Sequence, residues 1–212
     1  MGKWQNLSRR FFAEVNKHDM PYINPVYGLP QVDRFVEFDY CQRLRSDRVD
    51  RSNIAVHFFE DDYKFERAWT CPDRYGMMLK EFGYILGPDF SVYNNFPFPM
   101  RLYNIYRNAW LTKYWQEECR ITVVPTVMWG DASSWDWCFD HYPMNSIVAV
   151  SNVGCQSSQE DKDYFMNGYN VMLEKLHPTK ILVFTRNFAK LPGNVQYIRW
   201  EIHKGDQLNG SR

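Results

Sequence analysis

The sequence predicts an α/β fold of about five to six mostly parallel strands joined by crossover helices. Three apolar runs, at 84–88, 121–128 and 146–151, each lead directly into polar and aromatic residues. Buried parallel strands form such continuous runs, and helical segments between them favour right-handed crossovers. The architecture is either a small or incomplete (βα) barrel or an open doubly wound sheet. A complete eightfold barrel commonly needs about 250 residues, and the chain has 212.

Short apolar runs predict the strands, and apolar residues spaced three and four apart predict the helices. A helix is expected at 72–82, because Pro72 suits the first helical turn. A short helix is expected from residue 133 or 134, because either serine could cap it. The other expected elements are strands at 53–59, 84–88, 121–128, 147–150, 181–185 and 195–198, and helices at 99–119 and 159–176.

The first fifty residues differ from the rest of the chain. Pro21, Pro25 and Pro30 interrupt any regular element there. We therefore expect residues 1–50 to form an N-terminal extension that wraps the main body. Residues 51–212 are expected to form a single α/β domain, which is an ordinary domain size.

The charge balance argues against one class of function. The formal net charge is zero, whereas a protein held to duplex DNA mainly by bulk charge needs clustered basic residues. Arg43, Arg45, Arg48 and Arg51 lie close together, so a local basic patch and a solvated charged stretch both stay open. Aromatic residues make up 17% of the chain, and some of them are expected to line a groove or pocket.

The cysteines and histidines indicate neither a disulfide framework nor a metal site. The 5 cysteines form no C-x-x-C pair, and Cys138 with His141 gives the one metal-like spacing. No phosphate-binding glycine loop or metalloprotease motif occurs, so no metal is assigned and the cofactor stays unknown. The N-terminal residues lack the apolar core of a signal peptide, and no apolar run reaches about 18 residues. We therefore expect a cytoplasmic protein without a membrane partner.

Polar side chains follow the predicted strands at their carboxyl ends, where ligands bind in α/β proteins. Asp62 follows the first strand of the domain, and Asp89 and Ser91 follow Gly87 and Pro88. Trp129 and Asp131 follow the third strand, and Asn152 follows the fourth. Each carboxylate also has a structural interpretation. The carboxylates at 60–62 could form a solvated turn, Asp89 could cap its own turn, and Asp131 could cap the short helix.

The long helix contributes a polar stripe. Asn104, Arg107 and Asn108 are spaced three and four residues apart, which places them on one helical face. The same helix carries an apolar stripe. Such a helix either lines a site with its polar face or exposes that face to solvent.

Several blocks of sequence together resemble an uncharacterised family of phage and mobile-element proteins, the domain of unknown function 4417. The blocks are 57–69, 87–91, 103–110, 125–131 and 151–154, and the resemblance covers about residues 30–200. It implies a viral or mobile-element setting, and hence the cytoplasm of a host cell. The family has no established activity to carry over.

The residues favour a carboxylate-based site for a nucleotide, a nucleobase or a sugar. Asp62, Asp89 and Asp131 are the candidate catalytic acids and bases. Arg107 is a candidate clamp for an anion or substrate. The chemistry would be hydrolysis or transfer at a glycosidic bond, or a metal-assisted hydrolysis. The candidate substrate-binding residues are Arg107, Asn104, Trp129, Ser91 and Asn152.

A second hypothesis requires no catalysis. The chain could be a phage factor that sequesters a nucleotide signal or binds a host protein. It could also bind a single-stranded nucleic acid through exposed aromatic side chains. The sequence does not indicate an oligomeric state.

Overall fold

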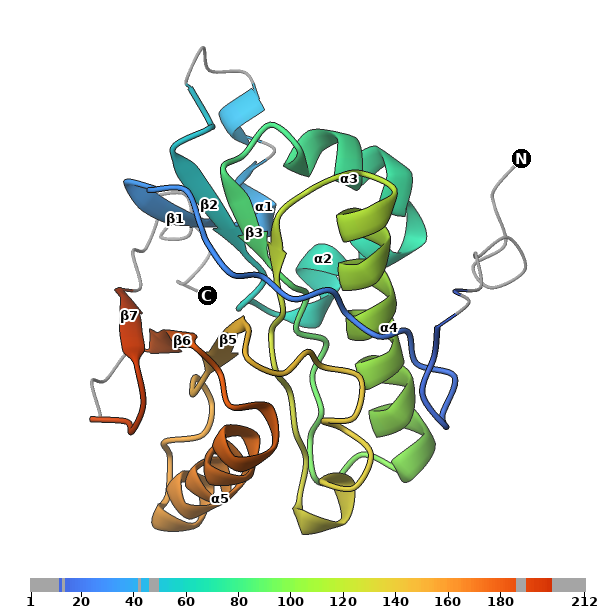
Figure 1. Ribbon diagram of the computed structural model, residues 1–212, viewed down its shortest axis with the longest axis vertical. Coiled ribbons are helices and arrows are strands. Elements are labelled where there is room, and N and C mark those ends of the chain that lie inside the picture. The colour runs from blue at the N-terminus through green and yellow to red at the C-terminus, as the bar shows by residue number, and fades with distance from the viewer. Residues whose placement is uncertain (1–11, 13, 42, 46–49, 186–189, 200–212) are drawn as a thin grey trace, which may run out of the picture.

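The computed structural model describes residues 12, 14–41, 43–45, 50–185 and 190–199. Its strands lie in two parallel sheets, which confirms the predicted α/β class. The first sheet has the order β1-β2-β3-β4 and the second has the order β5-β6-β7 (Figure 1). The strands are β1 (Arg34–Glu37), β2 (Ile54–His57), β3 (Tyr84–Leu86), β4 (Val123–Val124), β5 (Ile147–Ser151), β6 (Lys180–Thr185) and β7 (Val195–Arg199).

The two sheets are joined through the segment that follows β4. Thr126 forms a parallel bridge with Ala149, and the Val127 amide donates to the Ala149 carbonyl over 2.8 Å. Strand order therefore follows chain order throughout, as in a (βα) barrel, without the reversal of a doubly wound sheet. Among the described residues no pairing of β1 with β7 closes the barrel. The predicted incomplete barrel is the alternative that fits this order.

The helices are α1 (Phe38–Cys41), α2 (Asp62–Thr70), α3 (Pro72–Leu79), α4 (Phe98–Glu117) and α5 (Gln159–Leu176), with short 3-10 helices at Arg43–Arg45 and Ala132–Ser134. Figure 1 shows α2, α3 and α4 beside the first sheet and α5 beside the second. The bounds of α5 match the prediction because Ser158 and Asp161 form a capping box at its start. His177 then ends the helix in a left-handed conformation.

The structure contains elements that the sequence patterns did not predict. Residues of the expected N-terminal extension form β1, which pairs in parallel with β2. Helix α2 was also missed; it buries Phe65 and Trp69 against the outer core. The expected strand at 121–128 is reduced to the short β4 because Pro125 has no amide hydrogen to donate.

Both faces of the curved sheet are buried. On the helix-covered face, Val148 and Val150 of β5 pack with side chains of α4 and α5. On the other face, Ile147 and Ala149 of the same strand meet alternate side chains of β2 to β7. This double burial explains the continuous apolar runs in the sequence.

The described N-terminal residues cross the sheet ends and contact the second sheet. The Ile147 amide donates to the Val26 carbonyl over 2.8 Å, and the Ser146 hydroxyl accepts from the Val26 amide over the same distance. Val26 lies in the inner core cluster. No described helix is long and apolar enough to cross a membrane.

His141 lies in the core with no exposed surface. Neither of its ring nitrogens has a hydrogen-bond partner within the described part of the chain. Burial lowers the pKa of this imidazole from 6.5 to about 3, because the core cannot solvate the protonated ring. His141 therefore stays neutral in the folded protein down to acidic pH.

This burial makes stability depend on pH, and replacing His141 by leucine tests the effect. Between about pH 6.5 and pH 3 the unfolded chain binds a proton on this ring that the folded chain does not. Stability is therefore lost as the pH falls through this window. From pH 6.5 to pH 5, we expect the wild type to lose about 2 kcal/mol more unfolding free energy than H141L. Denaturant titrations measure this difference, and parallel pH profiles would contradict it.

Candidate functional site

A cavity of about 410 Å³ lies at the carboxyl ends of β3, β4 and β5, where the sequence predicted a site. Its walls come from the segments after these three strands and from the first half of α5. The residues that line it are Asp89, Ser91, Val92, Tyr93, Asn94, Asn95, Val127, Met128, Trp129, Ser151, Val153, Gly154, Cys155, Asp161, Tyr164 and Phe165. This volume falls in the range of small-molecule sites, which is roughly 300–1,000 Å³.

Three of the candidate residues from the sequence line this cavity: Asp89, Ser91 and Trp129. Asn152 is buried between two lining residues, and its side-chain oxygen has no hydrogen-bond partner within the described structure. The other candidates lie outside the cavity lining and are Asp62, Asp131, Asn104 and Arg107.

Asp89 is the carboxyl group with the strongest electrostatic perturbation in the cavity. Burial raises its pKa well above the ordinary value of 3.8, and the nearby charges of Asp62 and Glu60 raise it further. Both causes disfavour the ionised form. Burial also raises the pKa of the neighbouring Glu60 to about 7.

Residues 87–91 follow β3 and carry Asp89. We call this segment the β3 exit, and its first residue is closely packed. The Gly87 amide donates to the Val124 carbonyl over 2.8 Å, and the Gly87 carbonyl accepts from the Thr126 hydroxyl over 2.6 Å. A Cβ atom at residue 87 would lie 2.8 Å from the Thr112 hydroxyl oxygen. Glycine is therefore required for this close approach.

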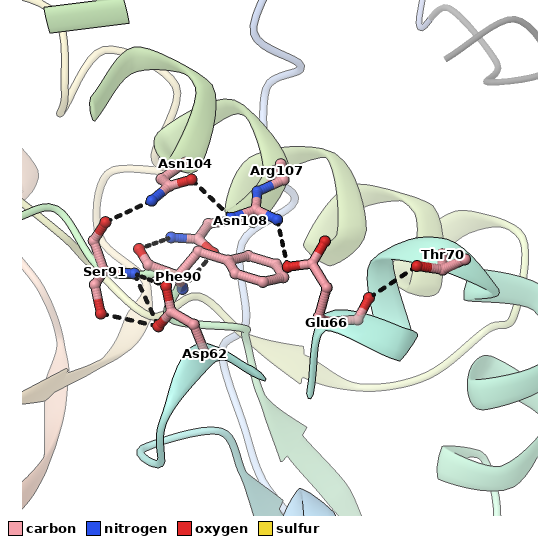
Figure 2. A network of polar contacts seen from close by, with 8 residues as sticks. All are labelled: Asp62, Glu66, Thr70, Phe90, Ser91, Asn104, Arg107 and Asn108. Carbon is pink, nitrogen blue, oxygen red and sulfur yellow. Dashed lines mark hydrogen bonds and ion pairs between the residues drawn. The ribbon is translucent and has the colours of Figure 1, made fainter. Parts of the chain in front are cut away.

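Asp62, in the first turn of α2, fixes the end of this exit (Figure 2). Its carboxylate accepts the Ser91 amide hydrogen, with N–O distances of 3.1 and 3.2 Å to its two oxygens. It also accepts the Ser91 hydroxyl hydrogen over 2.8 Å. Asp62, which lies outside the cavity lining, thus fixes the position of Ser91, which is part of that lining.

The polar stripe of α4 faces the same exit, as Figure 2 shows. Asn108 accepts from the Phe90 amide over 2.9 Å and donates to the Phe90 carbonyl over 3.2 Å. Asn104 donates to the Ser91 carbonyl over 2.6 Å. The stripe therefore binds the backbone of two consecutive residues instead of facing solvent.

Arg107 completes this network. Its guanidinium donates to Glu66 over 2.7 Å and to the Asn104 side-chain oxygen over 2.8 Å. Its central carbon lies 3.6 Å from the centre of the Phe90 ring, a cation–π contact. Arg107 is buried and committed to these partners.

Asp131 lies in a contrasting environment. It caps the 3-10 helix Ala132–Ser134 by accepting the Ser133 amide hydrogen over 3.0 Å, and it pairs with Arg101 over 3.1 Å. The hydrogen bond from the Ser133 hydroxyl and the Arg101 charge lower its pKa. These contacts favour the ionised form of Asp131, whereas the surroundings of Asp89 disfavour its ionised form.

Aromatic side chains form much of the cavity wall. Trp129 is 8% exposed and lies 5.4 Å from Phe165, measured between ring centroids. A Cβ atom at Gly168 would lie 2.2 Å from the Trp129 ring, so α5 approaches this ring without a side chain between them. The Tyr164 hydroxyl donates to the Asn94 side-chain oxygen over 2.5 Å. This bond ties α5 to the loop that follows Asp89.

Sequence reasoning missed Tyr93, Asn94, Asp161 and Tyr164. The polar and aromatic residues at 93–95 directly follow the predicted exit, and that proximity could have identified them. Asp161 and Tyr164 gave no comparable signal, since they lie on a helix distant in the sequence. No group of three or more His, Cys, Asp or Glu residues that could hold a metal ion occurs within the described ranges.

The contacts of Asp62 predict a stabilising role that its neighbour Asp61 lacks. Replacing Asp62 by alanine leaves the Ser91 amide and hydroxyl without their acceptor, so we expect a loss of about 1–3 kcal/mol in unfolding free energy. Asp61 is exposed and forms no side-chain capping bond. The matched variant D61A should change stability by less than about 0.5 kcal/mol. Chemical denaturation of both variants tests this, and equal losses would contradict it.

Comparisons with known proteins place the chain in a family. The family described as "Domain of unknown function (DUF4417)" matches residues 12–200. The "Gene 1 protein" of Mycobacterium phage L5 is 35% identical over 184 residues, covering 86% of this chain and 78% of that protein. The "Gene 1 protein" of Mycobacterium phage D29 is 37% identical over 186 residues, covering 87% of this chain and 67% of that protein. No solved structure matches the chain.

These matches confirm the resemblance drawn from the sequence blocks, and the two relatives are phage proteins. The chain therefore belongs to the phage protein family described as Domain of unknown function (DUF4417).

Proposed function

We propose that the cavity binds a small molecule with a sugar or base ring, and that Asp89 cleaves its glycosidic bond as a general acid. One observation carries this proposal: the carboxyl group of Asp89 lines a cavity with aromatic walls, and its pKa is raised. A raised pKa favours the protonated form of a carboxyl group, which is the form that can donate a proton to a leaving group.

The walls supply contacts for such a ligand. Trp129, Tyr93 and Phe165 offer ring surfaces, and the aromatic groups of α5 and of the β3 exit enclose the same space. Ser91 and Asn94 add hydrogen-bonding groups. Rings with polar substituents match this mixture of aromatic and polar groups.

The proposed reaction is a hydrolysis. The bond between the anomeric carbon and the leaving group breaks, and the leaving group takes the electron pair and the proton of Asp89. Water adds to the anomeric carbon, and the proton that it loses returns to the Asp89 carboxylate. Asp161 also lines the cavity, and its carboxylate would stabilise positive charge that develops on the sugar.

The other candidate acids take different roles in this proposal. Asp62 is a positioning residue, because its oxygens accept hydrogen bonds from Ser91. Asn104 positions the same segment by donating to the Ser91 carbonyl, and Arg107 supports Asn104 by donating to its side-chain oxygen. Asp131 anchors the segment after Trp129.

A second candidate function is binding without turnover, as in a phage factor that sequesters a small molecule. The observation that favours it is the engagement of Asp161. One of its oxygens accepts hydrogen bonds from the amide and hydroxyl of Ser158 in the capping box. A carboxylate used in this way is less available for catalysis.

The variant D89N separates the two candidates. Asparagine keeps the size of the side chain but has no acidic proton. We therefore expect D89N to keep ligand-induced thermal stabilisation and to lose cleavage by about 100-fold or more. A thermal-shift screen of nucleosides and glycosides, followed by product analysis of each hit, measures both effects.

Asp131 provides the matched control, since its carboxylate lies outside the cavity lining. D131N should cleave the same ligand at nearly the wild-type rate. Undiminished cleavage by D89N would contradict the role of Asp89. A wild-type protein that is stabilised by a ligand but leaves it intact would support sequestration instead.

A further inference from the structure

We infer that this cavity selects a ligand that carries a protonated amino group, such as a glycoside of an amino sugar. The inference rests on the proposed function for the location of the site, and it adds the charge of the ligand. Three observations carry it: the aromatic faces of the wall, the direction of its hydrogen bonds and the sign of the charged groups around it.

Four aromatic side chains line the cavity from three segments of the chain. Tyr93 follows the β3 exit, Trp129 follows β4, and Tyr164 and Phe165 lie on α5. The Trp129 and Phe165 ring centroids are 5.4 Å apart. The negative face of an aromatic ring attracts a cation that lies within about 6 Å of the ring centroid. The wall therefore offers several surfaces that favour a positively charged group.

The hydroxyl and carboxylate groups of Ser91, Tyr164 and Asp161 are available to a ligand as hydrogen-bond acceptors. The Ser91 hydroxyl already donates its hydrogen to Asp62 over 2.8 Å, so only its lone pairs remain. The Tyr164 hydroxyl donates to Asn94 in the same way. Asp161 accepts within its capping box through one oxygen, and its other oxygen accepts from no described residue. An ammonium group has three hydrogens to donate and matches these acceptors.

The charged groups of the cavity wall are acidic. Asp89 and Asp161 line the cavity, and among the described residues no lysine, arginine or histidine does. The negative charges of Asp62 and Glu60 act on Asp89 from outside the lining. Because the carboxyl groups come from both sides of the cavity, a cation gains attraction there and an anion meets repulsion.

Two basic side chains outside the lining do not reverse this sign. Lys162 follows Asp161 on α5, but it is exposed and lies roughly 100° round the helix from Asp161. Arg101 is paired with Asp131. Burial raises the pKa of Tyr164, the Asp131 charge raises it further, and the opposing effect of Arg101 is smaller. This pair therefore adds net negative potential at the Tyr164 side of the cavity.

Three small probes that share a benzene ring test the inference. At neutral pH benzylammonium is cationic, benzyl alcohol is neutral and benzoate is anionic. None of them has a glycosidic bond, so the measurement does not depend on turnover. Ligand-observed NMR measures their dissociation constants for the wild-type protein. We expect benzylammonium to bind at least about tenfold more tightly than benzyl alcohol, and benzoate to bind most weakly.

Two variants of α5 identify the source of the preference. D161N removes the carboxylate charge but keeps a side-chain oxygen that can accept from Ser158, so the helix cap is retained. We expect D161N to reduce the preference for benzylammonium by about threefold or more. Asp163 lies on the same helix but is exposed and outside the cavity lining. D163N should therefore leave the preference unchanged.

The outcomes separate this inference from the proposed function. Benzyl alcohol or benzoate binding as tightly as benzylammonium would overturn the inference, as would a failure of all three probes to bind or a preference that D161N leaves unchanged. A preference for benzylammonium in a protein that cleaves no glycoside would support the inference and refute the proposed hydrolysis. Cleavage of a neutral glycoside without this preference would do the reverse.

Discussion

The hydrogen-bonded exit of β3 is the constraint on which the candidate site depends. Asp62 and Asn108 bind the backbone groups of residues 90 and 91. Gly87 permits the close contact with Thr112 at the start of the same exit. Asp89 therefore lies between two fixed points. The backbone on both sides of Asp89 is therefore held in place, which favours a fixed position for a catalytic group.

The same network contributes to the raised pKa of Asp89. Asp62 holds Ser91 through hydrogen bonds, and its negative charge also raises the pKa of Asp89. Burial adds the larger part of that effect. Asp131, by contrast, keeps a lowered pKa through hydrogen bonds from Ser133 and its pair with Arg101. Two carboxyl groups at neighbouring strand ends thus have pKa values shifted in opposite directions by their surroundings.

The sequence predicted the parts of this arrangement that depend on local patterns. Parallel strands follow from continuous apolar runs, and the exit at Asp89 follows from Gly87 and Pro88. Helical spacing placed Asn104 and Arg107 on one face of α4. It could not show that this face binds the backbone of another segment, because that contact depends on tertiary packing. For the same reason, residue spacing could not predict that Asp62 accepts hydrogen bonds from Ser91.

Other features lay beyond any local pattern. Asp161 and Tyr164 reach the cavity only because α5 packs close to Trp129 at Gly168. The two interpretations of Asp131, as a site residue or as a helix cap, were equally compatible with the sequence. The hydrogen bond from the Ser133 amide shows that it caps the helix. The pKa of Asp89 depends on burial and on charges brought together by folding, so no motif could reveal it.

The proposed role of Asp89 depends on its protonation, which a carboxyl-carbon NMR titration measures. D89N assigns the Asp89 signal in the spectrum of aspartate-labelled protein. Asp89 should keep its proton to a higher pH than the exposed aspartates do. D62N, which removes a neighbouring charge, should move this titration to lower pH. Titration of Asp89 together with the exposed aspartates, unchanged in D62N, would contradict the proposed role of Asp89 as an acid.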